Sequence, residues 1–196
     1  MTYRPVSVVA PIAASICLLL AGTTGASAQI QCWMGPSAGP PVVNDPHIFC
    51  GEIRQRANGA FYATGFHSRP GGVNPVHIPA GGGAPVAIIG GGAVGPAAAG
   101  APAGIYRLTN FTITQGGVTQ VKAISTMYPD ACNQASVLVA IRNALAAAIA
   151  AGHVPPGNFN GPSGGGGACT AGGGAAFNIT GYTDAAGAVL TAYPAY

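Results

Sequence analysis

Residues 121–152, VKAISTMYPDACNQASVLVAIRNALAAAIAAG, join the end of a predicted β-strand to the one long helix that the sequence predicts. Pro129 and Asp130 start this helix, with Asp130 as its N-cap, and Gly152 ends it, so we expect a helix over 131–151. The large aliphatic residues recur at helical spacing and predict a face toward the core, formed by Leu138, Ile141, Leu145 and Ile149. The alanines between them are good helix formers and do not indicate a membrane span.

Paired extended runs surround this helix. Residues 105–114 and 118–124 are rich in β-formers and are joined by Gln-Gly-Gly, which indicates a hairpin. Residues 47–67 contain two short extended or irregular pieces around an Asn58-Gly59 turn. The runs FNITGYT and AVLTAYP, within 177–194, predict a C-terminal hairpin. The sequence therefore predicts an α+β domain in which antiparallel β-hairpins pack on one long helix.

The N-terminus has the features of a secretory signal peptide. Arg4 precedes an apolar run, and Ala26-Ser27-Ala28 fits the small-residue rule for cleavage. We therefore expect residues 1–28 to be removed, 29–46 to form an N-terminal arm and 47–196 to form one domain. The mature protein is expected to be secreted, either periplasmic or extracellular, without stable membrane association.

Glycine, alanine and proline dominate the composition, and only 6% of residues are Asp, Glu, Lys or Arg. Two stretches of low complexity, 80–104 and 154–176, predict loops because dense glycine and proline disfavour regular elements. Removal of Arg4 lowers the formal net charge from +3 to +2. This balance permits an anionic partner, but no dense basic patch indicates an electrostatic funnel of the DNA-binding kind.

Four cysteines remain after signal cleavage: Cys32, Cys50, Cys132 and Cys169. In an exported chain they predict two disulfides, for which three pairings are possible. We prefer Cys32–Cys50 and Cys132–Cys169, which would tether the N-terminal arm and the second glycine-rich stretch. A zinc site is the alternative, and no Cys-x-x-Cys or His-x-x-x-His spacing supports it.

Two of the four histidines have a suggestive context. His47 and His67 bracket the Asn58-Gly59 turn, so folding the segment back brings them to the same end of the domain. Two imidazoles that titrate near neutral pH can divide the work of a general base and a general acid. The alternative is that both are polar residues at element ends. His77 and His153 lie in predicted loops and fit exposed loop histidines.

Lys122 is the only lysine in the chain and lies near the end of a predicted strand. A lysine there suits a phosphate or a developing oxyanion, although a single lysine is usually a solvated surface charge. Ser125 and Thr126 follow closely and raise the alternative of a lysine-assisted serine hydrolase. Those enzymes use Ser-x-x-Lys on a helix, whereas here Lys-x-x-Ser leaves a strand, so the order disfavours that alternative.

Thr191 and Tyr193 are two residues apart on a predicted strand and therefore share one face. A hydroxyl beside an aromatic ring can hydrogen-bond the edge of a base and stack on a base or ribose. The alternative is an ordinary amphipathic strand end.

Three blocks of the chain, taken in order, resemble the bacterial EndoU-type nuclease domain. That domain is related to uridylate-specific endoribonucleases, and it often forms the tip of contact-dependent and polymorphic toxins. The blocks are HIFCGEI with GFHSRPGG, then KAISTMYPD with the helix ACNQASVLVAIRNAL, and finally ITGYTDAAGAVLTAYP. The resemblance covers residues 47–196, with the two low-complexity stretches as the divergent parts.

This resemblance implies a role for each candidate residue. The family's catalytic trio falls on His47, His67 and Lys122, its substrate-side Ser/Thr on Ser125 or Thr126, and its uridine-contacting Thr-x-Tyr on Thr191 and Tyr193. It implies cleavage of single-stranded RNA or tRNA, with a preference for uridine, by attack of the ribose 2′-OH to leave a 2′,3′-cyclic phosphate. His67 would be the base, His47 the acid and Lys122 the stabiliser of the phosphorane charge.

The family also implies the cofactors and partners. The reaction requires no metal or other cofactor, although manganese (Mn²⁺) stimulates some relatives. RNA is the expected substrate, and a cognate immunity or inhibitor protein is an expected partner. This chain departs from such toxins because it carries its own signal, so it resembles a free-standing secreted effector that is delivered into target cells. The alternative is a catalytically inactive secreted binding or surface protein that retains the fold.

Basic residues are sparse for an enzyme that acts on RNA. The expected phosphate contacts are Arg54, Arg56, Arg69 and Arg107.

Overall fold

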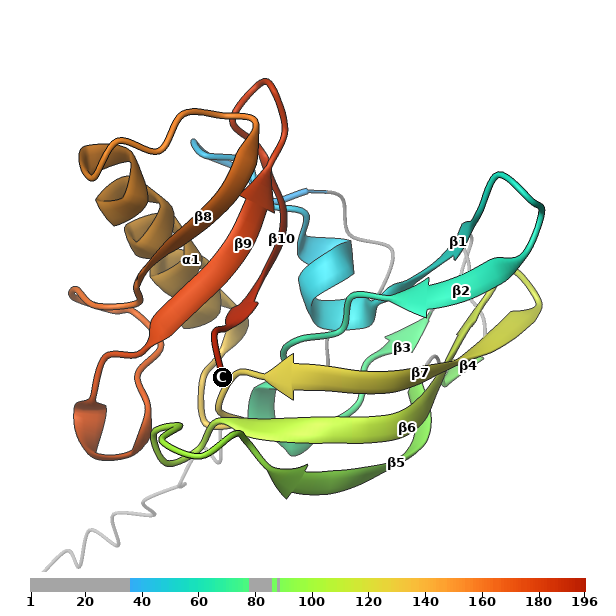
Figure 1. Cartoon of the computed structure of the whole chain (residues 1–196). Helices are drawn as coiled ribbons and strands as arrows, with labels where there is room; N and C mark the ends of the chain where they lie inside the picture. Colours follow the sequence, from blue (N-terminus) through green and yellow to red (C-terminus); the bar gives the residue numbers. More distant parts are fainter. Residues whose placement is uncertain (1–35, 78–85, 88) are drawn as a thin grey trace, which may run out of the picture.

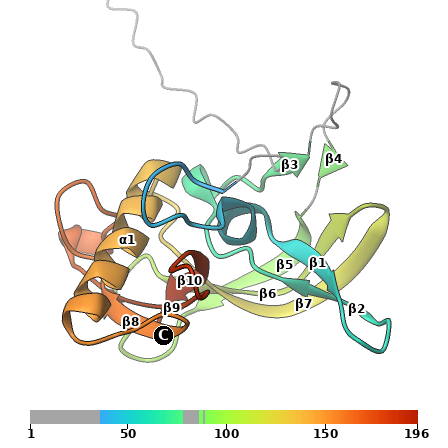
Figure 2. The ribbon, with the colours of Figure 1, turned by 90° about the horizontal axis from the view of Figure 1, so that it is seen from above.

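The computed structural model describes residues 36–77, 86–87 and 89–196, and the predicted signal peptide lies outside them. Figure 1 shows two halves joined by a short helical turn, η1 (Pro46–Cys50). In one half, helix α1 (Gln134–Ala150) covers a sheet with the order β10-β9-β8, formed by β8 (Gly157–Pro162), β9 (Asn178–Thr183) and β10 (Val189–Pro194). Seen from above, η1 lies between α1 and the second half (Figure 2).

The second half is built from antiparallel strands. Its main sheet has the order β5-β6-β7, formed by β5 (Ile89–Pro96), β6 (Tyr106–Gln115) and β7 (Val118–Met127). Beside β7 lies the hairpin of β1 (Glu52–Gln55) and β2 (Phe61–Thr64), and β3 (Val76–His77) pairs with β4 (Val86–Ala87). Short 3₁₀ turns occur at η2 (Pro70–Gly72) and η3 (Gly172–Gly174).

The predicted α+β class, the two predicted hairpins and the predicted Asn58-Gly59 turn are confirmed. β6 and β7 pair from Gln115 opposite Val118, around the Gly-Gly turn, and β9 pairs with β10. β1 and β2 pair around the Asn58-Gly59 turn, where Gly59 has a φ of +84° that glycine adopts without steric cost. The start of that segment is helical rather than extended, because His47 lies in η1.

The expectation that 80–104 and 154–176 are loops throughout is wrong for part of each stretch. β5 lies inside the first and β8 inside the second. Both strands are rich in glycine, and cross-strand hydrogen bonding to β6 and β9 holds them despite their weak intrinsic β-propensity.

The predicted start of the helix is also wrong. α1 begins at Gln134, and its N-cap is Asn133, whose side-chain oxygen accepts a hydrogen bond from the backbone N–H of Ser136 at 2.8 Å. Asp130 instead accepts hydrogen bonds from Tyr106 Oη at 2.5 Å and from Arg69 Nη2 at 3.1 Å. Asp130 therefore fastens the segment after His67 to the end of β7.

Small residues, rather than the predicted aliphatic stripe, form most of the buried face of α1. Ile149 is 51% exposed and Leu138 is partly buried, whereas Ile141 and Leu145 are buried as predicted. The other buried positions are Val137, Ala140, Ala144 and Ala148. The reason is a close approach to β8: a Cβ on Gly161 would lie 2.2 Å from the carbonyl oxygen of Ala144.

None of the helices in the described part of the chain is long and apolar enough to cross a membrane.

Two hydrophobic clusters form the core, one in each half. The larger lies among η1, α1 and the β8–β10 sheet and includes Ile48, Phe49 and Ile141. The smaller lies under the β5–β7 sheet and includes Phe66 and Phe111. Because Ile48 belongs to one cluster and Phe66 to the other, His47 and His67 lie at the junction of the two halves.

A candidate active site between the two halves

Backbone hydrogen bonds hold His47 and His67 side by side. The N–H of Phe66 donates to the carbonyl oxygen of His47 at 2.7 Å, and the N–H of His67 donates to that of Ile48 at 2.7 Å. Gly65, with a φ of +72°, permits this approach, since a Cβ there would lie 2.3 Å from the carbonyl oxygen of His47. The two imidazole rings are consequently 5.9 Å apart between centroids, although β1 and β2 separate them in the sequence.

The chain turns sharply just before His67. Phe66 is fully buried and has a φ of +60°, a conformation that is uncommon for a residue other than glycine. Its ring packs on Phe111 with a centroid distance of 5.5 Å, which holds the backbone in this conformation. The turn directs the carbonyl oxygens of Gly65 and Phe66 toward β7, where they accept hydrogen bonds from Lys122 Nζ and Ser125 Oγ.

A change of phase along β7 brings Lys122 and Ser125 to the same face. On a regular strand, residues three apart point to opposite faces. Here Ala123 and Ile124 are both exposed, and Lys122 Nζ donates to Ser125 Oγ at 3.0 Å. The neighbouring strand β6 changes phase at the same level, where Asn110 has a φ of +52° and lies between buried Leu108 and Phe111. Asparagine is one of the residues that tolerate this left-handed conformation.

The contacts of His67 determine which ring nitrogen carries the proton. Nδ1 lies 3.2 Å from the carbonyl oxygen of Thr126, which can only accept, and 2.9 Å from Ser125 Oγ. Ser125 Oγ donates its own proton to the carbonyl oxygen of Phe66 at 2.6 Å, so it accepts from Nδ1. Nδ1 is therefore the protonated nitrogen, and Nε2 keeps its lone pair.

The neutral form of His67 is strongly favoured. Burial, followed by the positive charges of Lys122 and His47, holds the pKa of His67 well below its usual value of 6.5. At neutral pH this side chain is a base with a free lone pair on Nε2, for which the described residues supply no hydrogen-bond partner.

His47 has a different environment, because an acidic side chain faces it. Its Nδ1 donates to Glu52 Oε1 at 2.5 Å, and Arg54 Nη2 lies 2.7 Å from the same oxygen. The hydrogen bond from His47, helped by Arg54, lowers the pKa of Glu52, so this carboxylate is ionised at neutral pH. The carboxylate therefore holds the Nδ1–H of His47 and fixes the orientation of its ring.

Lys122 is half-buried, and its ammonium group contacts Gly65 O and Ser125 Oγ. Burial lowers the pKa of Lys122 to about 8. The side chain is therefore mostly charged at neutral pH and loses that charge at mildly alkaline pH.

The β10 strand completes the site. Tyr193 stacks on His67, with ring centroids 5.0 Å apart and an interplanar angle of 26°. Thr191 is the register partner of Tyr182 on β9. These hydroxyl and aromatic side chains face the two histidines across the junction.

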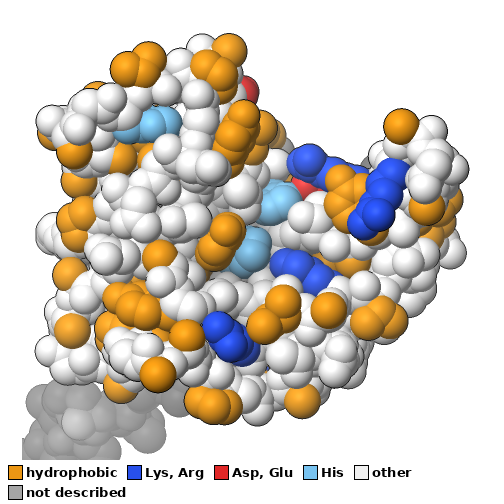
Figure 3. Space-filling view, in the orientation of Figure 1, with side chains coloured by type: hydrophobic (Ala, Val, Ile, Leu, Met, Phe, Trp, Pro, Cys, Tyr) orange, Lys and Arg blue, Asp and Glu red, His pale blue; other side chains and the backbone are white. Residues whose placement is uncertain are grey.

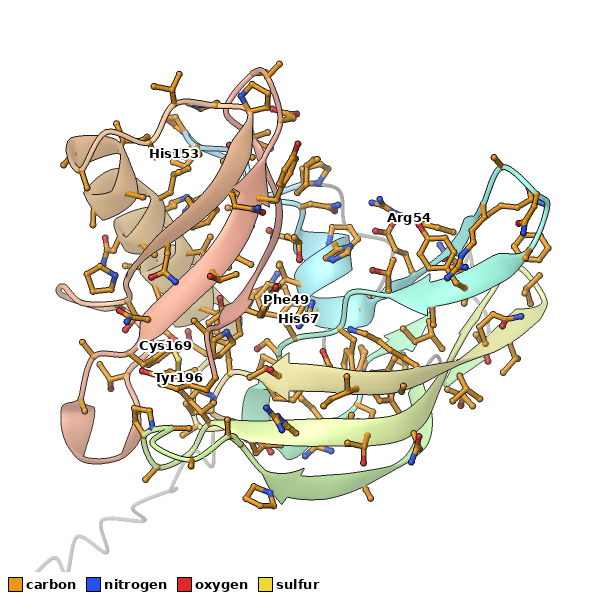
Figure 4. The ribbon with its side chains drawn as sticks, in the orientation of Figure 1. Phe49, Arg54, His67, His153, Cys169 and Tyr196 are labelled. Carbon is orange, nitrogen blue, oxygen red and sulfur yellow. A yellow bond between two sulfur atoms is a disulfide. The ribbon has the colours of Figure 1, made fainter. Side chains whose placement is uncertain are left out.

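These side chains surround a pocket of about 480 Å³. Figure 3 shows the hollow between the β8–β10 half and the β1–β2 hairpin, with histidines at its floor and basic side chains on its hairpin side. Figure 4 shows Arg54 on the hairpin and His67 below it, and both residues line the pocket. The residues that line the pocket are His47, Arg54, Thr64, His67, Lys122, Tyr182, Leu190, Thr191 and Tyr193.

Five of the seven site residues predicted from the sequence line this pocket, and two do not. Ser125 is 2% exposed and lies behind His67 and Lys122. Thr126 offers its carbonyl oxygen to His67, while its hydroxyl donates to the carbonyl oxygen of Tyr196 at 3.2 Å. Of these two residues, Ser125 is thus the one whose side chain contacts both His67 and Lys122.

Of the other two histidines, His153 does not line the pocket. His153 is at the far end of the β8–β10 half, where its Nε2 lies 3.2 Å from Thr183 Oγ1 (Figure 4). The side chain of His77 is outside the described part of the structure. Among the basic residues, Arg54 lines the pocket and Arg69 pairs with Asp130.

The structure adds Glu52, which the sequence prediction did not include. The chain has only four acidic residues, and Glu52 follows His47 by five positions. An acidic side chain so rare in the sequence and so close to a candidate histidine could have indicated Glu52 as its partner.

In residues 36–77, 86–87 and 89–196, no three His, Cys, Asp or Glu side chains gather in a way that could hold a metal ion.

One of the two preferred disulfides is present. Cys132 and Cys169 are bonded, which ties the start of α1 to the loop after β8. Cys32 lies outside the described residues, so its pairing with Cys50 stays a prediction.

Comparisons with known proteins agree with this geometry. The family described as Bacterial EndoU nuclease matches residues 42–196, which includes the whole pocket and both halves of the fold. No curated protein and no solved structure gives a match. Since the match covers most of the chain, this protein belongs to the bacterial EndoU nuclease family.

Proposed function

We propose that this nuclease is a secreted endoribonuclease that cleaves single-stranded RNA or tRNA on the 3′ side of uridine. The observation that carries the proposal is the unequal pair of histidines in one pocket. His67 has a free lone pair and an environment that keeps it neutral, whereas His47 donates a hydrogen bond from Nδ1 to the carboxylate of Glu52. Such a pair suits general base and general acid catalysis of one reaction.

The reaction needs no nucleophile from the protein. His67 Nε2 takes the proton of the ribose 2′-OH, and the 2′-oxygen forms a bond to phosphorus. The bond from phosphorus to the 5′-oxygen breaks, and His47 Nε2 gives its proton to that oxygen. The products are a 2′,3′-cyclic phosphate and a free 5′-OH. Each positioned acid or base typically contributes about 10²–10⁴-fold.

Lys122 supplies the positive charge that the pentacoordinate phosphorus requires. Its ammonium group lines the pocket beside His67 and is oriented by Gly65 O and Ser125 Oγ. Preorganised charge of this kind stabilises the transition state because it needs no reorganisation during the reaction. Ser125 Oγ is buried and already shared among three protein groups, which disfavours its use as a nucleophile.

Thr191 and Tyr193 are the candidates for recognising uridine. They stand on the wall of the pocket next to His67, where a hydroxyl can hydrogen-bond a base edge and a ring can pack on the ribose. This places the nucleotide that provides the attacking 2′-OH on the β10 side.

The proposed setting follows from the signal peptide and the family. We propose a secreted, toxin-like effector with a cognate immunity protein, which requires no metal and is stimulated by Mn²⁺. These properties do not affect the chemistry of the pocket and need separate tests.

One experiment tests the proposed reaction. The purified, oxidised mature protein is incubated with an oligoribonucleotide that contains a single uridine, and with the same oligonucleotide carrying 2′-deoxyuridine at that position. We expect cleavage of the first only, with a 2′,3′-cyclic phosphate end. Equal cleavage of both would exclude attack by the 2′-OH, and a folded protein that cleaves neither would favour an inactive binding protein.

A further inference from the structure

The β1–β2 hairpin has two chemically different faces. Ile53 and Ala63 pack against the hydrophobic cluster under the β5–β7 sheet. Strand alternation turns Glu52 and Arg54 to the opposite face, together with their cross-strand partners Thr64 and Tyr62. Glu52 contacts His47, and both Arg54 and Thr64 line the pocket. The polar face of the hairpin is therefore a continuation of the pocket wall.

This face extends outward through Arg56, which follows Arg54 by two residues and is exposed. The guanidinium carbon of Arg56 lies 5.1 Å from the centroid of the Tyr62 ring, within the range of a cation–π contact. The hairpin thus presents two guanidinium groups and one aromatic ring in a line that begins at the pocket. This combination of charge and an aromatic ring is typical of surfaces that bind single-stranded nucleic acid.

Of the other arginines in the described structure, Arg107 does not line the pocket, and Arg69 and Arg142 have structural partners. Arg69 forms an ion pair with Asp130, and Arg142 donates to Ala38 O at 2.8 Å and to Ser37 Oγ at 3.1 Å. Arg56, in contrast, has no acidic partner among the described residues, and Arg54 shares its one acid, Glu52, with His47. The hairpin is therefore where arginine charge remains available beside the pocket.

The opposite wall of the pocket has no charge. It consists of Tyr182, Leu190, Thr191 and Tyr193, all from β9 and β10. One wall thus suits a base and ribose, and the other suits a phosphate backbone.

The positions of the two histidines indicate in which direction the RNA strand runs across the pocket. In the proposed reaction, His67 acts on the nucleotide 5′ of the cleaved bond, and Tyr193 on β10 stacks on His67. His47 protonates the 5′-oxygen of the nucleotide 3′ of that bond, and Glu52 connects His47 to the hairpin. The leaving strand therefore departs on the hairpin side.

We propose that the polar face of the β1–β2 hairpin, formed by Arg54, Arg56 and Tyr62, binds the RNA segment 3′ of the cleaved bond. The two guanidinium groups contact the phosphates that follow the scissile one, and Tyr62 offers a surface for a base. The natural substrate is accordingly a chain that continues in the 3′ direction, rather than a dinucleotide. This inference rests on the proposed function, because the assignment of His47 as the acid sets the direction.

The test measures binding, so that it does not depend on cleavage. The probes are two fluorescent oligodeoxynucleotides with one deoxyuridine, extended by four nucleotides either only on its 3′ side or only on its 5′ side. Affinities are measured from 50 to 300 mM salt for the wild type, Arg54→Gln and Arg56→Gln. Arg54→Lys and Arg56→Lys are the matched controls, since they keep the charge.

We expect each glutamine variant to weaken binding of the 3′-extended probe by about fivefold to tenfold at 50 mM salt, and to reduce its salt slope by about 0.7. Binding of the 5′-extended probe should not change, and the lysine variants should keep the wild-type slope. Arg56→Gln is the cleaner variant, because Arg56 does not contact Glu52.

Two results would overturn the inference: an unchanged salt slope in both glutamine variants, or a loss confined to the 5′-extended probe. The proposed reaction is tested separately. If the wild type binds the 3′-extended probe in this arginine-dependent way but cleaves no RNA, the binding surface stands and the proposed reaction fails. If it cleaves RNA while both glutamine variants bind as the wild type does, the reaction stands and the binding surface fails.

Discussion

Nδ1 of His47 and Oε1 of Glu52 are 2.5 Å apart, and the same carboxylate oxygen accepts from Arg54. This contact fixes the tautomer of His47, because a carboxylate can only accept. It also leaves Nε2 of His47 as the nitrogen that can act on a substrate. Glu52 is thus a positioning residue, acting through His47.

Replacing Glu52 by Gln tests this role. The amide can still hydrogen-bond but carries no charge, so we expect kcat on RNA to fall by about tenfold to a hundredfold. The activated substrate uridine 3′-(4-nitrophenyl phosphate) should be cleaved at nearly the wild-type rate, because its leaving group needs no proton. An equal loss on both substrates would contradict a role through the general acid.

The same pair of substrates separates the two histidines. We expect His47→Ala to lose most of its activity on RNA, by about 10²–10⁴-fold, and to regain much of it on the 4-nitrophenyl ester. His67→Ala should lose activity on both substrates, since the 2′-OH must be deprotonated in either reaction. If His67→Ala rather than His47→Ala is rescued by the activated ester, the acid and base are assigned the wrong way round.

Lys122 predicts a pH dependence. Burial lowers the pKa of Lys122 to about 8, so its charge is mostly present at pH 7 and mostly lost at pH 9. Arginine stays charged throughout this range. We expect Lys122→Ala to lose most activity at pH 7, and the ratio of kcat/KM for Lys122→Arg to that of the wild type to rise by about tenfold from pH 7 to pH 9. A constant ratio would show that the charge of Lys122 does not limit the reaction.

Ser125→Ala removes the hydroxyl that connects His67, Lys122 and Phe66. We expect a loss of about 1–3 kcal/mol in the free energy of unfolding, measured in urea, because Phe66 O is left without its donor. Activity should fall but not vanish, since Nδ1 of His67 retains Thr126 O. Complete loss of activity in a stably folded variant, with covalent labelling of the wild type by a fluorophosphonate, would support the serine hydrolase alternative.

The Cys132–Cys169 disulfide closes a loop with a sequence separation of 37 residues. Loop-closure entropy gives it about 4 kcal/mol of stability. We expect the double variant Cys132→Ser, Cys169→Ser to unfold at lower urea and to retain activity where it is folded, because neither cysteine lines the pocket. Loss of activity without loss of stability would show that the bond shapes the site.

Local signals explain what the sequence predicted correctly about the fold. The Gln-Gly-Gly turn has β-rich runs on both sides and predicts a hairpin, because the turn and strand preferences of neighbouring residues agree, and Asn58-Gly59 predicts a turn by its own residue types. The start and the buried face of α1 were predicted wrongly because both depend on distant partners. Asp130 is taken by Tyr106 and Arg69, and the close approach of Gly161 selects alanines for the buried face.

The sequence by itself determined which chemical groups are available: two histidines beside one turn, a single lysine, and a threonine two residues before a tyrosine. Only the tertiary structure decided how they meet. The phase change along β7, at the level of Asn110 on β6, brings Lys122 and Ser125 together, and the turn at Phe66 directs two carbonyl oxygens toward them. The physical reason is that spacing along the sequence determines which side chains are neighbours only within one helix or strand. His67 and Thr126 are 59 residues apart, and they meet through backbone pairing and the packing of the two halves.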